Sequence, residues 1–557
     1  MNTIPSDTNV VGDSPGFLAK ERTIAPPGFN RWLVPPAALA MHLCIGMAYG
    51  FSVFWLPLSK AIGIKESIGC GADIGFLQEL TVTHCDWKIS TLGWMYTLFF
   101  VFLGSSAALW GGWLEHVGPR KAAVVSAFCW CGGMLFSTLG IYFHQFWMML
   151  LGSGVIGGIG LGLGYISPVS TLIKWFPDRR GMATGMAIMG FGGGAMIGSP
   201  LAAELIKFFA TESDVGVMPT FVVMASVYFV FMMAGALGYR VPAPNWKPAN
   251  WQAPDNLKTN KMITQKHVHV KNVFKIKQFW LLWGVLCMNV SAGIGIIGMS
   301  SPMLQEVFGG QLIGINKLYA DLDKNQLTAI AAVAAGFTAL LSLFNIGGRF
   351  FWASLSDKLG RKTTYLLFFL LGILLYLSIP ESANTGNILL FVGAFCLILS
   401  MYGGGFSTVA AYLADLFGTQ MVGAIHGRLL TAWATAGILG PVIVNYMREH
   451  QLASGIPREQ VYNQTMMILA GMLMVGLVCN LLIRPVADKW FMTESELAEE
   501  KHLAHETVSI SQSVSEVEVN IAKPTLLITV LVAWLAVLLP LGWGIYKTLL
   551  NLGKFFS

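Results

Sequence analysis

The chain has 557 residues, of which 55% are hydrophobic and only 11% are charged, with a formal net charge of +6 at pH 7. A soluble globular chain carries about 25% charged residues, so this composition, with a mean hydropathy of +0.62, excludes an ordinary water-soluble domain and indicates a protein of the lipid bilayer. The sequence has no basic surface with interleaved aromatic residues, which is the pattern that would predict a nucleic-acid partner. We therefore expect the positive charge to set orientation in the membrane.

The residues before the first apolar block are polar and contain no apolar core segment, so we expect a tail over 1–31 rather than a cleaved signal peptide. Twelve apolar blocks follow and a thirteenth lies near the C-terminus, each close to the roughly 20 residues that a helix needs to cross a bilayer. We therefore predict an all-α membrane protein. The expected helices are 32–59, 89–112, 122–142, 145–173, 182–209, 219–239, 279–301, 328–354, 364–380, 387–416, 422–446, 464–483 and 524–546.

Eight cysteines are spread along the chain, and six of them fall in apolar segments, where thiols usually serve packing. Cys129 and Cys131 are two residues apart, but no histidine or carboxylate converges on them, so no metal site is predicted. Cys70 and Cys85 lie in the polar loop after the first helix. A disulfide between them depends on whether that loop faces an oxidising compartment.

The longest interior break between apolar blocks is basic. Its position after six helices predicts that both this loop and the N-terminus are cytoplasmic, because basic loops stay on that side of the membrane. The segment 485–523 is acidic, but acidic residues contribute little to orientation, and we assign it to the same side. The basic residues of the break are Arg240, Lys247, Lys258, Lys261, Lys266, Lys271, Lys275 and Lys277, against a single acid, Asp255.

Two sets of six helices repeat one another. The second helix of the first set ends in WGGWLEHVGPRKA (110–122), and the matching helix of the second set ends in WASLSDKLGRKT (352–363). Each motif places an acid, Glu115 or Asp357, three residues before a glycine that a basic pair follows. Parallel six-helix repeats joined by a central loop are a known transporter architecture. The predicted units are 32–239 and 279–484, with a loop over 240–278, an acidic linker over 485–523 and a last helix over 524–546.

These paired loop motifs resemble the signature of the major facilitator superfamily. Within it, GMAYGFSVFWLPL (46–58), KWFPDRRGMATG (174–185) and NIGGRFFWASLSDKLGRK (345–362) resemble the oxalate/formate antiporter family, which is related to the monocarboxylate transporters. The resemblance covers about 33–485. It implies the major facilitator fold of two pseudo-symmetric halves, with a site near the midplane and alternating access. The last helix resembles a short single-span protein that accompanies such transporters, here fused to the chain.

Arg349 is the central candidate for substrate binding. It lies in the middle of an apolar helix, where a charge is costly and faces the bundle interior. Its guanidinium stays protonated and offers a planar fork to a carboxylate. The resemblance implies that this arginine is a substrate ligand, whereas the alternative is an arginine that only bonds backbone carbonyls or a neighbouring helix.

The resemblance also implies a lysine on the eleventh helix in transporters of dicarboxylates, but here the corresponding stretch reads LLTAWATAGILGP (429–441), and Trp433 takes the lysine position. One buried cation balances one carboxylate, so a monocarboxylate such as formate, acetate, lactate or pyruvate is favoured over oxalate. Trp433 is expected to close the pocket as an apolar wall, with simple helix packing as the alternative.

Proton coupling finds little support among the acidic residues. Asn345 lies one turn before Arg349 on the same face, where the related monocarboxylate transporters are expected to carry an aspartate, and asparagine does not titrate. His42 in the first helix is the remaining titratable candidate, although a lone helical histidine is more often a packing residue.

Two further groups of candidates complete the site. Aromatic residues on helices that line the cavity in this fold are expected to box the substrate, with membrane-interface belts as their alternative role. Charged residues at the loop motifs are expected to form pairs that close one face and break as the halves rock, or only to set orientation. The first group is Tyr49, Tyr96, Tyr165 and Tyr402, and the second is Glu115, Arg120, Arg179, Arg180, Asp357 and Arg361.

The sequence thus predicts a secondary transporter of small organic anions, working as a monomeric unit in the inner membrane of a bacterium, with no cofactor and no enzymatic activity. Anion exchange is favoured because no proton relay is evident. The alternatives are a proton-coupled monocarboxylate symporter, an oxalate/formate antiporter and a membrane sensor that binds a carboxylate without moving it.

Overall fold

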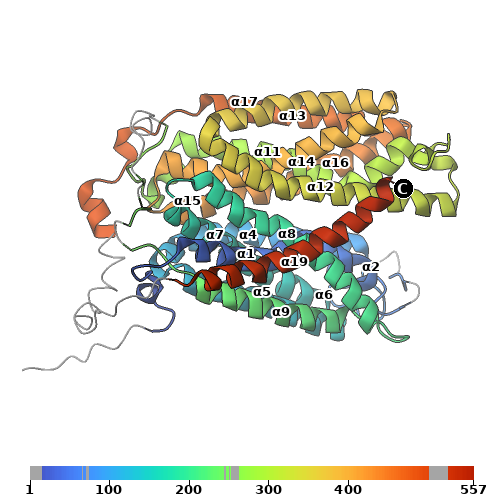
Figure 1. Cartoon of the computed structure of the whole chain (residues 1–557). Helices are drawn as coiled ribbons and strands as arrows, with labels where there is room; N and C mark the ends of the chain where they lie inside the picture. Colours follow the sequence, from blue (N-terminus) through green and yellow to red (C-terminus); the bar gives the residue numbers. More distant parts are fainter. Residues whose placement is uncertain are drawn as a thin grey trace, which may run out of the picture.

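The computed structural model describes residues 16–64, 67–70, 74–243, 246–249, 251, 262–500 and 525–556. Within these residues, 13 helical segments are long and apolar enough to cross a membrane, as the sequence predicts. They form two bundles that lie side by side, with the last helix running diagonally across them (Figure 1).

The N-terminal bundle contains six spans. The first, Arg31–Leu58, changes from α-helix to the tighter 3₁₀ form in its middle, and the fourth, Phe146–Trp175, has a π-helical stretch after its first α-helical turn. The elements are α1 (Val34–Ile45), η3 (Gly46–Phe54), α2 (Trp55–Leu58), α4 (Ile89–Val117), α5 (Pro119–Tyr142), α6 (Phe146–Met149), η4 (Leu150–Gly157), α7 (Gly158–Trp175), α8 (Arg180–Phe209) and α9 (Val217–Gly238).

The C-terminal bundle repeats this plan with the next six spans. The eleventh span of the chain is interrupted at Leu430. Polar caps begin two helices of this bundle: the Asp323 carboxylate accepts the N–H groups of Asn325 and Gln326 at the start of α12, and the Asn387 side chain accepts the N–H of Leu390 at the start of α14. The elements are α11 (Lys277–Phe308), α12 (Lys324–Leu359), α13 (Arg361–Asn384), α14 (Ile388–Phe417), α15 (Val422–Leu429), α16 (Thr431–Ala453) and α17 (Asn463–Leu482).

The two loop motifs adopt the same backbone turn. Gly118 separates α4 from α5 and Gly360 separates α12 from α13, and each glycine has φ +85°. A side chain would be strained there, so glycine is needed to end one helix and begin the next within a single residue. The repeated sequence motif is therefore a repeated structure.

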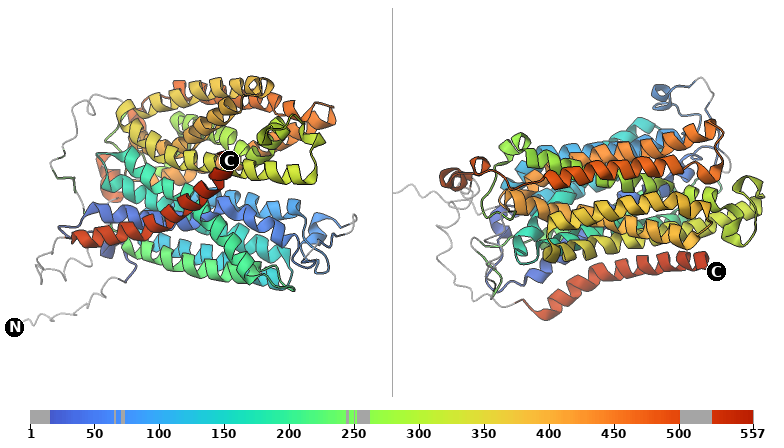
Figure 2. Two further views of the ribbon diagram at one scale, coloured as in Figure 1. Left: turned by 45° about the vertical axis from the view of Figure 1, so that its right-hand side comes forward. Right: turned by 90° about the horizontal axis from the view of Figure 1, so that it is seen from above.

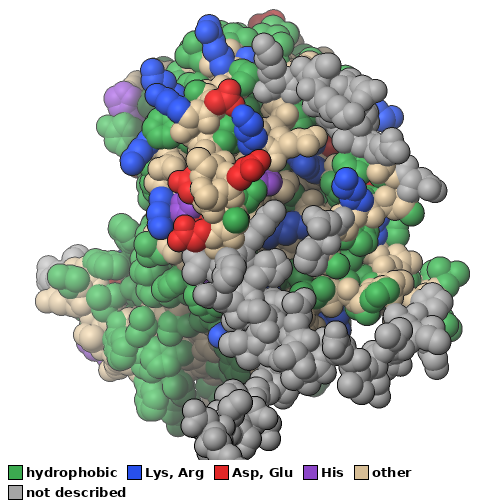
Figure 3. Space-filling view, turned by 90° about the vertical axis from the view of Figure 1, so that its left-hand side faces the viewer, with side chains coloured by type: hydrophobic (Ala, Val, Ile, Leu, Met, Phe, Trp, Pro, Cys, Tyr) green, Lys and Arg blue, Asp and Glu red, His purple; other side chains and the backbone are tan. Residues whose placement is uncertain are grey.

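The two ends of the bundle differ in chemistry. We call the end that carries these turns the motif end, where Lys and Arg side chains gather (Figure 3). The opposite end, which we call the disulfide end, carries a disulfide between Cys70 and Cys85, whose Cα atoms are 5.1 Å apart. The Asp86 carboxylate orders the same loop by accepting backbone N–H groups of Ile62, Gly63 and Ile68.

The thirteenth span, α19 (Leu527–Phe556), lies against both bundles. It starts beside the N-terminal bundle at the motif end and crosses toward the C-terminal bundle at the disulfide end (Figures 1 and 2). Val537 packs with Leu39 of α1, and Leu541 packs with Met196 of α8 and Ile346 of α12. Helix α19 therefore covers part of the seam between the two halves.

Candidate functional site

Arg349 is fully buried on α12, at the seam between the halves. Its Nε donates to Asn345 Oδ1 at 3.1 Å, one turn earlier on the same helix. Its Nη1 donates to the backbone carbonyl of Ile188 on α8, in the opposite half, at 3.1 Å. Its Nη2 is buried without a hydrogen-bond partner, and the guanidinium forms no ion pair with any carboxylate in the described ranges. One arm of the fork is therefore left available for an anion.

Two glycines make room for this arginine. A Cβ at Gly192 of α8 would lie 3.0 Å from Arg349 Nε, and a Cβ at Gly403 of α14 would lie 3.1 Å from Arg349 Cγ. Both distances are shorter than ordinary carbon contacts. The guanidinium thus lies in a slot between α8 and α14 that larger residues would narrow.

Aromatic rings from both halves surround the guanidinium. Its Cζ is 5.9 Å from the ring centroids of Tyr49 and Phe191 and 5.4 Å from that of Phe406. These distances allow cation–π attraction, which helps a buried cation that lacks an anion. Tyr49 also meets Tyr402 across the seam, with their hydroxyl oxygens 3.1 Å apart.

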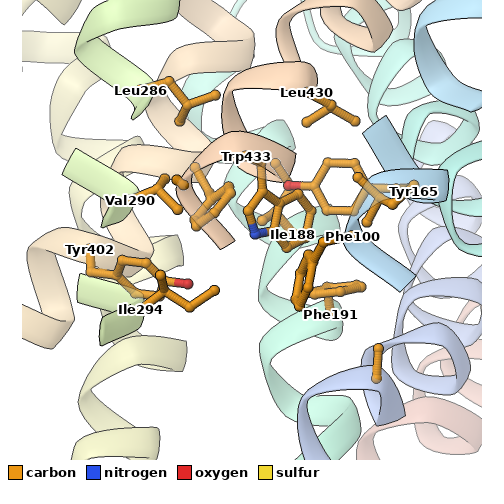
Figure 4. Close-up of a cluster of buried hydrophobic side chains, with 14 of the residues drawn as sticks. Phe100, Tyr165, Ile188, Phe191, Leu286, Val290, Ile294, Tyr402, Leu430 and Trp433 are labelled. Carbon is orange, nitrogen blue, oxygen red and sulfur yellow. The ribbon is translucent and has the colours of Figure 1, made fainter. Parts of the chain in front are cut away.

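Trp433 lies at the centre of the same cluster (Figure 4). Its ring is fully buried and packs against Phe406 at 4.7 Å, Tyr165 at 5.2 Å and Phe191 at 5.4 Å between centroids. The structure thus places Trp433 as an apolar wall that spans the two halves. The cluster fills the middle of the bundle in this conformation.

Three buried donors around this cluster lack partners in the described part of the chain: Arg349 Nη2, the Tyr165 hydroxyl and Trp433 Nε1. Buried polar groups are normally satisfied, because leaving them unpaired costs free energy. An anion-binding site requires buried donors that lack an acceptor of their own. The unpartnered guanidinium nitrogen can donate to a small carboxylate, and no cluster of His, Cys, Asp or Glu side chains that could hold a metal ion lies among the residues that the structure describes.

The other predicted residues lie farther from this centre. Tyr96 is half-buried on α4 and reaches the cluster through Phe100, 4.9 Å away between ring centroids. His42 is buried on α1, with Nδ1 2.5 Å from the carbonyl oxygen of Ala187 and Nε2 3.1 Å from that of Tyr165. His42 therefore joins α1 to α8 and α7.

The sequence analysis missed Phe191, Phe406 and Phe100, which supply much of the wall. A phenylalanine in an apolar helix carries no mark that separates a cavity-lining ring from a lipid-facing one.

At the motif end, each acidic motif residue binds the start of a helix in the opposite half. Asp357 of α12 accepts the N–H groups of Gly181 and Met182, both at 2.9 Å, at the N-terminus of α8. Glu115 of α4 accepts the N–H of Gly423 at 2.9 Å, at the N-terminus of α15. A carboxylate is stabilised at a helix N-terminus, where N–H groups are unpaired and the dipole is positive. These two contacts hold the motif end closed.

Ion pairs reinforce this closure. Arg180 of α8 binds Asp415 of α14 in the opposite half at 3.0 Å. Arg361 binds the same Asp415 at 3.2 Å and Asp357 at 2.6 Å. Glu115 in turn binds Lys174 at 2.6 Å. Of these pairs only Arg180–Asp415 crosses the seam; it brings Arg180 together with Arg361 and Asp357, while Glu115 and Lys174 pair within the N-terminal half.

The remaining two gating candidates make other contacts. Arg120 donates to the backbone carbonyls of Phe17, Leu237 and Tyr239, all within its own half. Arg179 is largely exposed and lies 3.9 Å from Asp178. Lys20, from the N-terminal tail, donates to the backbone carbonyl of Glu115 at 2.7 Å, and burial, with Lys174 nearby, lowers the pKa of its amine.

Known proteins resemble this chain over most of its length. The oxalate:formate antiporter of Oxalobacter formigenes is 23% identical over 417 residues, which are 74% of this chain and 83% of that protein. The apicoplast pyruvate carrier 1 of Toxoplasma gondii is 24% identical over 453 residues, 70% of this chain and 78% of that protein. The crystal structure of the E. coli fucose:proton symporter matches the fold with a TM-score of 0.53 at 13% identity, covering 81% of this chain and 98% of that one.

A family model describes the same region. The model of the Major Facilitator Superfamily matches residues 38–441, which include both loop motifs, the Arg349 slot and the Trp433 cluster. The family consists of membrane transporters and not of enzymes. The chain belongs to the Major Facilitator Superfamily.

Proposed function

We propose that this protein is a secondary transporter that exchanges small monocarboxylates, of the formate, acetate, lactate or pyruvate class, across the inner membrane of a bacterium. The observation that carries the proposal is the free arm of Arg349. A buried guanidinium without a carboxylate partner is a strong site for an incoming anion.

The charge of the site supports a single carboxylate. Among the described residues, Arg349 is the one buried cation that contacts the aromatic cluster. On α16, at the position where a second cation would be expected in a dicarboxylate transporter, the cluster contains the uncharged Trp433. A substrate with two carboxylates would leave one of them facing apolar rings, which costs free energy. The relatives named above, an oxalate:formate antiporter and a pyruvate carrier, are consistent with a small organic acid as substrate.

The positive-inside rule assigns the motif end to the cytoplasm and the disulfide end to the oxidising outer side. The closed motif end then corresponds to a state in which substrate exchanges with the outer side. Transport would require the contacts of Glu115 and Asp357 to break and the halves to rock about the Arg349 slot.

Counterflow in proteoliposomes tests this proposal. Vesicles loaded with one unlabelled acid are diluted into a trace of the same acid carrying a label, across a panel of one- to four-carbon mono- and dicarboxylates. We expect transient accumulation of labelled monocarboxylates, compared with protein-free vesicles. A carboxylate sensor gives no accumulation with any acid, and counterflow limited to dicarboxylates would contradict the assignment of substrate class.

A further inference from the structure

His426 is a buried histidine that neither the binding site nor the closed motif end uses. It lies on α15, seven residues before Trp433 of α16, and both side chains contact the Tyr165 ring. Its side chain is 2% exposed, and both Nδ1 and Nε2 are buried without a hydrogen-bond partner. Its ring contacts Tyr165 of the opposite half, with 5.9 Å between ring centroids.

This position is between the Arg349 site and the closed motif end. The Tyr165 ring contacts His426 on one side and Trp433, at 5.2 Å, on the other. Three residues before His426, the N–H of Gly423 binds the Glu115 carboxylate that holds the motif end closed. The imidazole is therefore sealed from motif-end water by the same contact that must break on opening.

A buried imidazole without partners is poorly stabilised, because neither its donor nor its acceptor is satisfied. Opening of the motif end would separate α15 from α4 and α7 and let water reach the ring. In water a histidine changes charge between pH 5 and 8. The ring is thus able to take a proton from the motif end only when that end opens.

The other ionisable groups on the surrounding elements are already held by partners. His42 on α1 contacts two backbone carbonyls, Glu115 on α4 binds Lys174, and Asp415 on α14 binds Arg180 and Arg361. Arg428, two residues after His426 in α15, donates to the carbonyl of Val270. The Tyr165 hydroxyl has no partner in the described ranges and stays neutral in water over this pH range. Both ring nitrogens of His426 are without a partner, whereas each ring nitrogen of His42 has a carbonyl oxygen beside it, so the two histidines differ in what a proton would gain.

We propose that His426 is a proton-binding site of the translocation path, loaded from the motif end and linked to carboxylate binding. The proton from water forms an N–H bond at the unprotonated ring nitrogen and gives an imidazolium beside the Arg349 site. A second positive charge attracts an anion, so proton and carboxylate strengthen each other's binding. This proposal rests on the proposed function for its substrate and adds to that exchange a proton that accompanies the bound carboxylate; its first test needs no substrate.

The first test follows opening of the motif end. Thr184 is buried there, and its hydroxyl donates to the Ser407 carbonyl of the opposite half at 2.8 Å. Thr184→Cys is labelled with a membrane-impermeant maleimide from the motif side, in protein with His426 and with His426→Gln. The ratio of the two labelling rates cancels the pH dependence of thiol chemistry. We expect this ratio to rise at least threefold from pH 7.5 to pH 5.5, and a constant ratio would overturn the proposal.

The second test measures equilibrium binding of labelled pyruvate to purified protein at the same two pH values. We expect binding to tighten as the pH falls, by at most tenfold per pH unit for one linked proton, and to lose this dependence in both His426→Gln and His426→Leu. His450→Gln is the matched control, because His450 is exposed at the far end of α16 and should keep the wild-type dependence. An unchanged pH dependence in both His426 variants would overturn the proposal. If no carboxylate shows binding or counterflow, the proposed function fails, while the labelling ratio still decides the role of His426.

Discussion

At the residue scale, the proposed function makes Trp433 the residue that limits how many charges the substrate can carry. Its indole lies against Phe406, Tyr165 and Phe191, the rings that surround the Arg349 site. A lysine at this position would add a second buried cation, which a second carboxylate could balance. We expect Trp433→Lys to shift counterflow from monocarboxylates toward dicarboxylates by about tenfold, corresponding to roughly 1.4 kcal/mol of differential binding.

The control for this substitution is Trp433→Phe, which keeps an apolar ring and adds no charge. It should lower the rate while leaving the ratio of mono- to dicarboxylate transport unchanged. If Trp433→Lys folds and keeps the wild-type ratio, the eleventh span does not set substrate charge.

At the element scale, the acidic motif residues act on helices of the opposite half. Asp357 accepts two N–H groups at the start of α8 and also binds Arg361. Replacing this carboxylate with an amide keeps an acceptor oxygen but removes the negative charge at the helix N-terminus, which contributes up to about 1 kcal/mol. Asp357→Asn should therefore shift the equilibrium toward an open motif end by roughly fivefold, measured as faster maleimide labelling of Thr184→Cys.

The matched control is Asp178→Asn, because Asp178 binds Arg31 within the same half. We expect this variant to label at the wild-type rate, since the pair that it removes does not cross the seam. Equal labelling of the Asp357 and Asp178 variants would contradict the role of Asp357 in closure.

Helix α19 is the second element with a predictable effect. Through Val537 and Leu541 it packs on α1, α8 and α12 at once, and so it contacts both halves in the closed-motif conformation. Packing between helices stabilises association in a bilayer, where lipid replaces water around apolar residues. Removal of residues 524–557 should leave two folded halves but increase labelling of Thr184→Cys about two- to fivefold.

Lys547→Gln is the control for this truncation, because it keeps the helix and removes the ion pair with Glu204 at 2.5 Å and the cation–π contact with Trp543 in the same helix. Such partly exposed pairs contribute at most about 1 kcal/mol, so labelling should stay near the wild-type rate. A truncated protein that labels no faster than the full chain would show that α19 does not favour the closed motif end.

At the scale of the whole molecule, the disulfide end is stabilised by a covalent link. The Cys70–Cys85 disulfide closes a loop with a sequence separation of 15 residues, for which chain entropy predicts about 3 kcal/mol of stabilisation. Cys70→Ser should lower the thermal unfolding midpoint by several degrees, whereas Cys129→Ser, which changes a free thiol in α5, should leave it nearly unchanged.

The same disulfide tests orientation. A membrane-impermeant reductant applied to intact cells should expose Cys70 and Cys85 to a thiol label, because we assign this end to the outer side. Labelling that requires permeabilised cells would place the disulfide end in the cytoplasm.

The repeat and the membrane made part of this structure predictable. A charge at membrane depth must face the interior of the bundle, and this predicted the position of Arg349. The matched loop motifs predicted that Glu115 and Asp357 have equivalent roles in the two halves. Their partners are backbone N–H groups of Gly181, Met182 and Gly423, which carry no sequence signature of their own. Only the three-dimensional arrangement shows that each acid binds the opposite half.

Other features lacked any local signal. His426 lies in a short glycine-containing segment that resembles ordinary packing sequence, and its importance depends on the absence of partners around it. The thirteenth span was predicted as a helix, but a helix that is apolar on nearly every face does not specify which neighbours it contacts. Its diagonal path over the seam became evident only from its packing (Figure 2).

The account depends most on the free arm of the Arg349 guanidinium, and counterflow of a labelled monocarboxylate tests it most directly. A charge-assisted hydrogen bond contributes about 1.5–3 kcal/mol, so Arg349→Lys, which keeps the charge but loses the fork, should reduce the rate by roughly 10- to 150-fold. Arg349→Ala should reduce counterflow to that of protein-free vesicles while the purified protein remains monodisperse. Counterflow at the wild-type rate in folded Arg349→Ala would contradict the account.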